Sequence, residues 1–268
     1  SSSIAVGDYP IDLHFCTTGL SDVFFSVMPY QIPYETTIPE NVDGFMVAEK
    51  NISVSHIVNG TTRLQPVVMA ISQAVGAAAA LSVQENVQPR NVNISALQET
   101  IFSYGGSIVY FKDVPQYHFA YPSISMAYSD NLTVGYEDFT FRPDVKITRD
   151  ELTSLASKIT DLSTNPSFAL DGYFKNENVK RAELAGFLAN YFSYPYHLSV
   201  DSTQDLPYKD VSKENSHYDE IGKLLMLNVL SSNEKFRPDD YATRAETIVL
   251  LERTMKYLRT DFTASVQE

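Results

Sequence analysis

The second half of the sequence contains three arginines that each stand two residues before a glutamate: Arg149 before Glu151, Arg181 before Glu183 and Arg244 before Glu246. A guanidinium group carries several N–H donors in one plane, so it can bind a carboxylate or a phosphate through two parallel hydrogen bonds. When such an arginine opens a helix, the unpaired backbone N–H groups beside it also favour an anion. The three arginines are therefore candidate receptors for an acidic ligand.

The same residues can instead have a structural role. Thr148 and Thr243 stand three residues before Glu151 and Glu246. This spacing predicts a capping box, in which the glutamate binds the start of its own helix. The arginines can also pair with the glutamates. The spacing favours the structural role for the glutamates and leaves both roles open for the arginines.

These residues lie in a unit that occurs twice. A Phe-Lys-Asp-Val motif at residues 111–114 recurs as Tyr-Lys-Asp-Val at 208–211, and Phe-Arg-Pro-Asp occurs at both 141–144 and 236–239. Apolar residues at helical spacing predict one helix between the two motifs and a second helix after each threonine. The aspartate of the first motif is expected to precede the first helix and to accept its N-terminal N–H groups. Residues 174–183 are expected to form a third, abbreviated copy.

From about Phe111 onward, this order of elements resembles the S-layer homology module. The resemblance implies a pseudo-threefold helical bundle that attaches exported bacterial proteins to secondary cell-wall polysaccharide. It also implies that the three arginines and their glutamates bind acidic sugar groups in grooves between repeats. Two departures put individual grooves in doubt: Lys180 stands where the other copies have threonine, and Asp150 adjoins Arg149. In the last repeat Ala245 takes the place of Asp150, so we expect that repeat to offer the more receptive groove.

Several runs in the N-terminal part resemble the C-terminal part of an FAD-dependent oxidoreductase of the glutathione-reductase-like class. Some members of that group carry a xanthan lyase label. The runs are residues 9–14, 30–34, 47–53, 63–66 and 73–80, together with His56 and Gly60.

This second resemblance implies that a helix starting near Leu64 aims its first N–H groups at the flavin and stabilises the reduced anion. It implies cofactor contacts from residues on both sides of the helix start, namely Ala48, Glu49, Gly60, Arg63, Leu64, Gln65 and Pro66. Glu49 stands where the family commonly has glycine, which could block the approach of the cofactor. The alternative is an alanine-rich core helix without a ligand. The nearest candidates for catalytic groups are His14 and His56, although a lone histidine is more often structural.

The sequence contains no Gly-x-Gly-x-x-Gly turn, which cradles the pyrophosphate in dinucleotide-binding folds. We therefore expect FAD in the parent protein but no FAD held tightly by this chain alone. The chain starts at Ser1 without an initiating methionine or a signal-peptide pattern. We expect a fragment whose partner is the missing FAD-binding portion of the oxidoreductase.

Composition excludes several classes of partner. A net charge of −13 over 268 residues repels nucleic acids and anionic lipids. The single cysteine, Cys16, excludes a disulfide framework and a cysteine-based zinc site, and no metal site is expected. The uncharged stretch 64–84 is rich in alanine, valine and serine rather than leucine. That composition favours a buried helix over a membrane span.

The predicted fold class is α+β, with an incomplete FAD-oxidoreductase segment followed by an all-α bundle of S-layer-homology-like repeats. In the first part we expect strands at 24–28 and 44–48, and helices at 65–83 and 95–103. Asn93 or Ser95 should cap the second helix. The predicted domains are the oxidoreductase segment and three repeats, at residues 1–105, 106–160, 161–204 and 205–268.

The favoured function is that of an exported bacterial FAD-dependent oxidoreductase held at the cell wall by its repeats. This chain itself would be a binding module without turnover. The first alternative is a purely structural wall-binding protein in which the flavin-type segment no longer works. The second is a polysaccharide lyase, for which the sequence shows no Tyr/Arg/His constellation at informative spacing.

Overall fold

The computed structural model describes residues 1–14, 22–159, 174–196 and 205–265. Within these ranges the chain forms two compact units, Ser1–Phe141 and Arg142–Glu268, which are called unit 1 and unit 2 below and are described separately. Unit 1 combines short strands with helices, and unit 2 is helical. The α+β class is confirmed. Cys16 lies outside the described residues.

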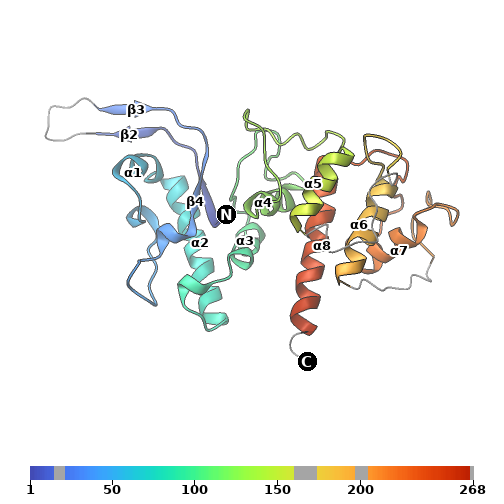
Figure 1. The fold of residues 1–268 in the computed structure, drawn as a ribbon. Coiled ribbons are helices and arrows are strands. Elements are labelled where there is room, and N and C mark those ends of the chain that lie inside the picture. Colours follow the sequence, from blue (N-terminus) through green and yellow to red (C-terminus); the bar gives the residue numbers. More distant parts are fainter. Residues whose placement is uncertain (15–21, 160–173, 197–204, 266–268) are drawn as a thin grey trace. The chain divides into compact units, whose positions relative to one another are not determined.

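Unit 1 contains two antiparallel strand pairs (Figure 1). β1 (Ser3–Gly7) pairs with β4 (Tyr30–Pro33), and β2 (Ile11–Leu13) pairs with β3 (Val23–Phe25). The predicted strand at 24–28 is therefore present as β3, although it ends at Phe25.

The predicted strand at 44–48 is wrong. These residues form no ladder, and Val47 N–H donates a single backbone hydrogen bond to Thr37 O at 2.8 Å. Met46 and Val47 pack against the core beside α2 (Gln65–Gln84). Their apolar character thus reflects contact with a helix rather than membership of a sheet.

The long helix α2 is the centre of unit 1. It starts at Gln65 with Pro66 in its first turn, where the missing N–H costs nothing, and it ends one residue beyond the predicted range. Its buried residues are Val67, Val68, Ile71, Ala74, Val75 and Ala78. They face β1 on one side and α3 (Ile94–Ser103) on the other. The small alanine side chains allow this close packing on two sides.

Among the described residues, α2 is also the one helix long and apolar enough to cross a membrane. Length and composition do not distinguish a membrane span from a buried core helix, because both can be long and apolar. In unit 1, 33% of its most apolar stretch is buried, and the contacts with β1 and α3 account for that burial. These contacts support a core helix, while the absence of a membrane span stays a prediction.

Two further helices of unit 1 have side-chain caps. Ser55 accepts a hydrogen bond from Val58 N–H at the start of α1 (His56–Thr62). Asn93, one of the two predicted caps, accepts one from Ala96 N–H at the start of α3. Three short 3₁₀ turns, Tyr34–Thr37, Glu49–Asn51 and Pro89–Asn91, and the helix α4 (Tyr121–Ser129) complete the unit.

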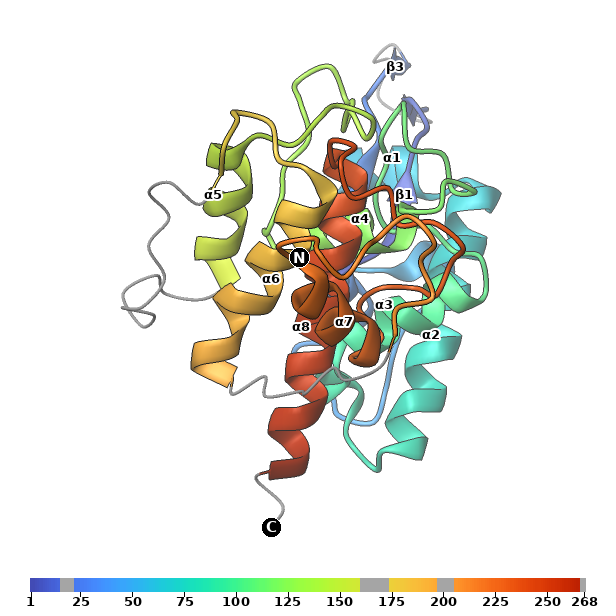
Figure 2. The same cartoon turned by 90° about the vertical axis from the view of Figure 1, so that its right-hand side faces the viewer.

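Unit 2 contains α5 (Arg149–Ile159), α6 (Arg181–Tyr196), α7 (Tyr218–Met226) and α8 (Arg244–Ser265). Figure 2 shows α5, α6 and α8 running side by side, and α8 contacts both of the others. Fully buried Leu152, Phe187 and Leu251 contribute to the core between them. The helices after the threonines are therefore present where the apolar spacing predicts them.

Asp113 and Asp210 have a different role from the one expected. Asp210 accepts hydrogen bonds from Phe236 N–H and Arg237 N–H, both at 2.8 Å. Asp113 accepts one from Phe141 N–H at 2.7 Å. Each carboxylate thus joins the two sequence motifs of its repeat instead of capping the helix between them. Burial opposes ionisation of Asp210, but the two backbone donors outweigh it and lower the pKa of this carboxyl group.

Asp210→Ala should lower the free energy of unfolding by about 1.5–3 kcal/mol, because two charge-assisted hydrogen bonds are lost. Asp205→Ala is the control, since Asp205 pairs with Lys213 on the surface with 80% of its side chain exposed. Its effect should stay within about 0.5 kcal/mol. Urea unfolding followed by circular dichroism measures both.

The stability difference between wild type and Asp210→Ala should also depend on pH. A carboxylate with a lowered folded-state pKa stabilises above its unfolded pKa, and that contribution disappears as the pH falls through the folded value. The stability difference between wild type and Asp210→Ala should therefore be full at neutral pH and shrink in acid. A difference that is constant with pH would contradict the role given to Asp210.

Candidate functional site

Three extended segments, one before each of α5, α6 and α8, bind one another in a closed ring. Ile147 N–H donates to Ala242 O at 2.9 Å, Ala242 N–H donates to Val179 O at 2.9 Å, and Val179 N–H donates to Ile147 O at 3.1 Å. The cycle returns to its starting residue, and all three side chains are fully buried. We call the residues 145–149, 177–181 and 240–244 the backbone ring.

A second set of bonds in the backbone ring fixes the three arginines. Arg149 N–H donates to Glu177 O at 2.8 Å, Arg181 N–H to Asp240 O at 2.9 Å and Arg244 N–H to Val145 O at 2.8 Å. Each arginine is therefore held by the segment that precedes a different helix. This arrangement directs each arginine toward another repeat, so an arginine can meet the glutamate of another repeat.

Arg244 meets Glu151 in this way. Its guanidinium forms an ion pair with the Glu151 carboxylate, and only 7% of the Arg244 side chain is exposed. An intact buried ion pair changes the free energy of folding little. Removing one partner destabilises the fold strongly, because the other charge is then buried without a counter-charge. The expectation that Arg244 opens the more receptive groove does not agree with this burial.

Arg181 is engaged on three sides. Its Nη1 pairs with Glu246 Oε1, its Nε donates to Phe236 O at 2.8 Å, and its guanidinium lies 5.1 Å from the centre of the Phe236 ring. Arg237 also contacts Glu246, at 2.9 Å. With 17% of its side chain exposed, Arg181 is a second internal arginine.

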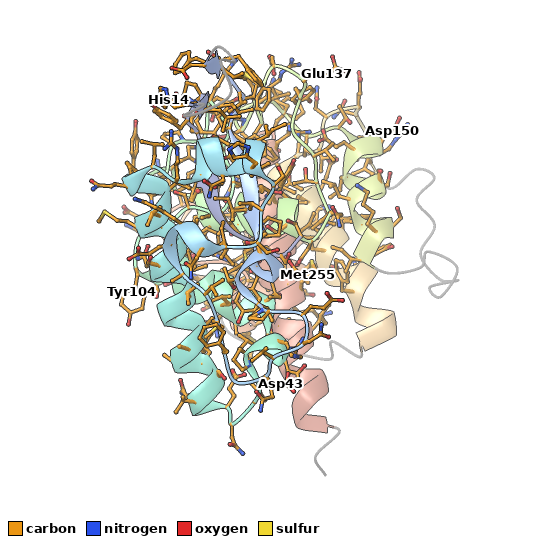
Figure 3. The ribbon with its side chains drawn as sticks, turned by 90° about the vertical axis from the view of Figure 1, so that its left-hand side faces the viewer. His14, Asp43, Tyr104, Glu137, Asp150 and Met255 are labelled. Carbon is orange, nitrogen blue, oxygen red and sulfur yellow. The ribbon has the colours of Figure 1, made fainter. Side chains whose placement is uncertain are left out.

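Arg149 departs from this scheme. If it followed the others it would pair with Glu183, but its Nε contacts Asp150 Oδ1 at 3.0 Å. The side chains of Arg149 and Asp150 are 52% and 85% exposed, and Asp150 lies at the start of α5 in Figure 3. Glu183 is buried and accepts a hydrogen bond from Lys180 N–H at 2.9 Å. Arg149 is therefore the most accessible of the three arginines.

The glutamates divide between two structural roles. Glu246 forms the complete capping box, accepting from Thr243 N–H at 3.0 Å while its own N–H donates to Thr243 Oγ1 at 3.2 Å. Glu183 makes the corresponding bond to the residue before its helix, which is Lys180. Glu151 N–H binds Thr148 Oγ1 at 3.2 Å, but its carboxylate pairs with Arg244. Each of the three glutamates thus holds a helix start or joins two repeats, as the structural interpretation requires.

The residues with predicted cofactor contacts lie around the start of α2. The 3₁₀ turn Glu49–Asn51 packs on α2, and Glu49 adopts a left-handed backbone with φ of 65°. This conformation favours glycine, so the position keeps the backbone shape of a glycine although a glutamate occupies it. Ala48 and Leu64 are half-buried, and Gln65 and Pro66 are exposed.

Arg63 and Gly60 serve the packing of unit 1. Arg63 donates to the backbone oxygen of Asp12 at 2.9 Å. A Cβ atom added to Gly60 would collide with the Leu13 side chain and lie 3.1 Å from Asp12 O. Gly60 is therefore needed for the close approach of α1 to β2. A flavin can meet the exposed start of α2, but the described residues offer no glycine-rich cradle for a pyrophosphate.

The two histidines lie on neighbouring elements, because α1 packs on β2. His14 follows β2 and contacts Asp22 at 2.8 Å and Asp12 at 3.0 Å. The hydrogen bond to Asp22, followed by the charges of both aspartates, raises the pKa of His14. Its side chain is 59% exposed. His56 is the exposed first residue of α1. Neither position identifies a catalytic histidine.

Family comparisons agree with this division of the chain. Residues 1–101 match the family of FAD dependent oxidoreductases, and residues 110–153 and 207–248 match the S-layer homology domain. The chain joins an FAD dependent oxidoreductase segment to S-layer homology domains. No curated protein matches it. The matched families give the xanthan lyase label no support.

The matches cover most of the candidate residues. The oxidoreductase match contains the predicted cofactor contacts and both histidines, and the S-layer homology matches contain Arg149 and Arg244 with their glutamates. Arg181 lies outside both matches, although its segment takes the third place in the backbone ring. The oxidoreductase family implies FAD in the parent enzyme, and the S-layer homology domains indicate a protein associated with the cell surface.

Sequence reasoning missed the backbone ring. The available signal was the apolar residue two places before each arginine, which is Ile147, Val179 or Ala242. All three are fully buried. An extended segment of this length is too short to stand out as a strand, since each segment contributes only isolated bridges.

Arg244→Ala should lower the free energy of unfolding by about 3 kcal/mol, because it leaves the Glu151 carboxylate without its partner. Arg149→Ala should change it by less than about 0.5 kcal/mol, since an exposed ion pair contributes little. Urea unfolding of the two variants beside wild type measures the difference. Equal destabilisation would show that the ion pair with Glu151 does not stabilise the fold.

Proposed function

We propose that this chain holds an exported bacterial FAD-dependent oxidoreductase at the cell wall, and that Arg149 binds an acidic sugar group of the wall polysaccharide. One observation carries the choice of residue. Arg181 and Arg244 are committed to glutamates of other repeats, whereas Arg149 is half exposed and paired with an exposed aspartate. S-layer homology domains typically bind cell-wall polysaccharide, and Arg149 lies in the first matched domain.

A ligand anion can replace the present partner of Arg149 more easily than that of Arg244. A surface pair between two solvated side chains is worth about 0–1 kcal/mol, so a carboxylate or phosphate of a ligand can replace Asp150 at low cost. At Arg244 a ligand would have to displace Glu151 from a pair that is mostly shielded from water. The helix start beside Arg149 adds a favourable field for an anion.

Asp150 limits the affinity of this site. Its carboxylate lies beside the guanidinium that the ligand must reach, and like charges in close contact repel. The net charge of −13 adds a weaker, long-range repulsion of acidic polymers. Binding at this single site should therefore be modest, and removal of the Asp150 carboxylate should strengthen it.

A purely structural role is the second candidate, and the backbone ring favours it. Two of the three arginines stabilise the bundle, and the glutamates that follow the arginines all have structural contacts. In that case the repeats would form an architectural bundle, and the oxidoreductase segment would carry the function. Sedimentation with wall polymer separates the two candidates.

Arg149→Ala should weaken sedimentation with purified acidic wall polysaccharide about tenfold to hundredfold, as expected for the loss of one charge-assisted contact. Asp150→Ala should strengthen it by removing the competing carboxylate. The matched control is Lys213→Ala, because Lys213 is also an exposed cation paired with an exposed aspartate, Asp205. Its effect should be less than about twofold.

Two outcomes would contradict the proposal. If wild type does not sediment with the polymer, the repeats are an architectural bundle. If Arg149→Ala and Lys213→Ala weaken sedimentation equally, the effect comes from net charge and Arg149 is not a specific receptor.

For the oxidoreductase segment we propose that flavin binding needs a separate phosphate-binding part. FAD carries a pyrophosphate, and such a group requires backbone N–H donors from a glycine-rich turn. Phe24, Phe25 and Phe45 are at least half exposed, so these aromatic side chains of unit 1 are available for contact with such a part. FAD would supply hydride-transfer chemistry when bound, and the backbone N–H groups at the start of α2 would favour an anionic edge of the flavin placed there.

The purified chain should retain no FAD after gel filtration, because the start of α2 alone cannot hold the pyrophosphate. Absorbance at flavin wavelengths measures retention. Glu49→Gly is the informative companion, since it removes an exposed side chain from the turn that packs on α2 and leaves a backbone conformation that glycine accepts. Both proteins should stay colourless. A yellow Glu49→Gly protein would identify Glu49, rather than the missing turn, as the obstacle.

A further inference from the structure

Unit 1 contains a cavity of about 310 Å³ that none of the predicted sites uses. One wall comes from β1 and β4, with Val6, Tyr30 and Gln31. A second wall comes from α4 and from the segments on either side of it, and it consists mainly of aromatic side chains. These are Tyr110, Phe111, Tyr128, Tyr136 and Phe139. The cavity thus lies where the oxidoreductase segment meets the first S-layer homology domain.

The aromatic wall is rigidly built. Phe111 packs edge-on against Tyr128, with ring centres 5.4 Å apart. A Cβ atom added to Gly135 would collide with the Phe111 ring, so only glycine allows the turn to pass this close to the ring. Phe139 has a left-handed backbone with φ of 63°. Its carbonyl accepts a hydrogen bond from Lys112 N–H at 2.8 Å, which holds the ring in the wall.

Comparison with the other complete repeat shows that the cavity is not a general feature of the module. In both repeats the residues after the first helix make the same backbone bonds: Leu132 N–H to Ala127 O, and Val229 N–H to Leu224 O. Lys112 N–H binds Phe139 O just as Lys209 N–H binds Glu234 O. These anchors place Phe139 opposite Glu234.

Between the anchors the two repeats differ. The first has the five residues Val-Gly-Tyr-Glu-Asp at 134–138, and the last has Ser-Ser-Asn at 231–233. The longer turn supplies Gly135 and Tyr136. The positions of Tyr110, Tyr128 and Phe139 are occupied in the last repeat by Pro207, Leu225 and Glu234. The first repeat has therefore acquired an aromatic wall that the scaffold does not require.

The lining determines what the cavity can hold. None of the described residues that line it carries a carboxylate, ammonium or guanidinium group, although the Lys112 ammonium lies 5.9 Å from the centre of the Phe139 ring. A charged ligand inside the cavity would lose hydration without a charged partner in the lining. Glu137 and Asp138 on the same turn further disfavour an anion.

Gln31 Nε2 donates to Ile108 O and Gln31 Oε1 accepts from Ser1 Oγ, both at 3.3 Å, and the Tyr30 hydroxyl contacts Thr61 Oγ1 at 2.9 Å. An amide has two N–H donors and two lone pairs, so Gln31 keeps one of each for the hydroxyl groups of a ligand. The volume lies at the small end of the range for ligand sites, about 300–1,000 Å³.

We propose that this cavity binds an uncharged sugar ring, with the apolar face of the ring against Tyr136 and Phe139 and its hydroxyl groups toward Gln31. A pyranose combines a flat face of C–H groups with a rim of hydroxyls, which matches an aromatic wall beside an amide. The site is separate from Arg149, which binds acidic groups in the proposed function. The chain then has one receptor for neutral sugar units and another for acidic units.

The test uses two uncharged disaccharides, diacetylchitobiose and cellobiose, as probes in saturation-transfer NMR and calorimetric titration. Wild type should bind at least one of them with a roughly millimolar dissociation constant, as expected for a small open site. Tyr136→Ala should weaken binding about tenfold, the order of effect that loss of a stacking side chain produces. Tyr117→Ala is the control, because Tyr117 is 91% exposed and does not line the cavity.

A second variant replaces residues 134–138 by Ser-Ser-Asn, the turn that the last repeat already uses between the same anchors. It should unfold at nearly the same urea concentration as wild type and lose the disaccharide signal. The inference is overturned if wild type binds neither probe. It is also overturned if Tyr136→Ala and Tyr117→Ala bind equally well.

The neutral probes also keep this inference distinct from wall anchoring. Arg149→Ala should bind the disaccharides as wild type does, since no acidic group is involved. If the chain does not sediment with acidic polymer, the disaccharide result still stands. If neither disaccharide binds, the proposal that Arg149 binds acidic sugar groups is unaffected.

Discussion

The helical part of this chain depends on the backbone ring formed by residues 145–149, 177–181 and 240–244. Each segment donates to one of the others and accepts from another, so the hydrogen-bonding groups of Ile147, Val179 and Ala242 are satisfied without a regular sheet. A buried backbone group without a partner costs as much as a lost hydrogen bond. Leaving out any one segment would expose such groups on the other two. All three segments are therefore needed to satisfy these backbone groups.

The ring explains why the arginines of similar repeats differ in role. Backbone bonds direct each arginine toward another repeat, where a glutamate is available for Arg181 and Arg244. At Arg149 the neighbouring Asp150 offers a nearer carboxylate. The Arg149 side chain is 52% exposed, and Glu183 caps its own helix without an ion pair to Arg149.

Much of the fold could be predicted from the sequence because the relevant signals are local. Pro66 marks the start of α2, Asn93 caps α3, and Thr243 with Glu246 forms the expected capping box. The predictions that failed concern contacts between distant residues. Residues 44–48 have an apolar pattern like that of a strand but pack on a helix. Asp210 binds a turn 26 residues away, which no local pattern reveals.

The candidate sites show the same limit. The oxidoreductase resemblance led us to expect glycine at position 49, and the glutamate found there has a left-handed backbone conformation that favours glycine. The burial of Arg244 depends on Glu151 of another repeat, so the residues beside Arg244 could not predict it. The aromatic cavity brings together residues 6, 31 and 136, which are far apart in the sequence.

The bonds made by Asp113 and Asp210 affect the order in which contacts can form. They close loops of 28 and 26 residues, whereas the backbone ring joins segments from all parts of unit 2. The entropy lost on closing a loop grows with its length, so each aspartate closes its loop at lower cost than the ring does. Contacts between near neighbours also form faster than contacts between distant ones. Each aspartate can therefore preassemble its own hairpin of motif, helix and turn. Closure of the ring is the step that requires every segment to be present.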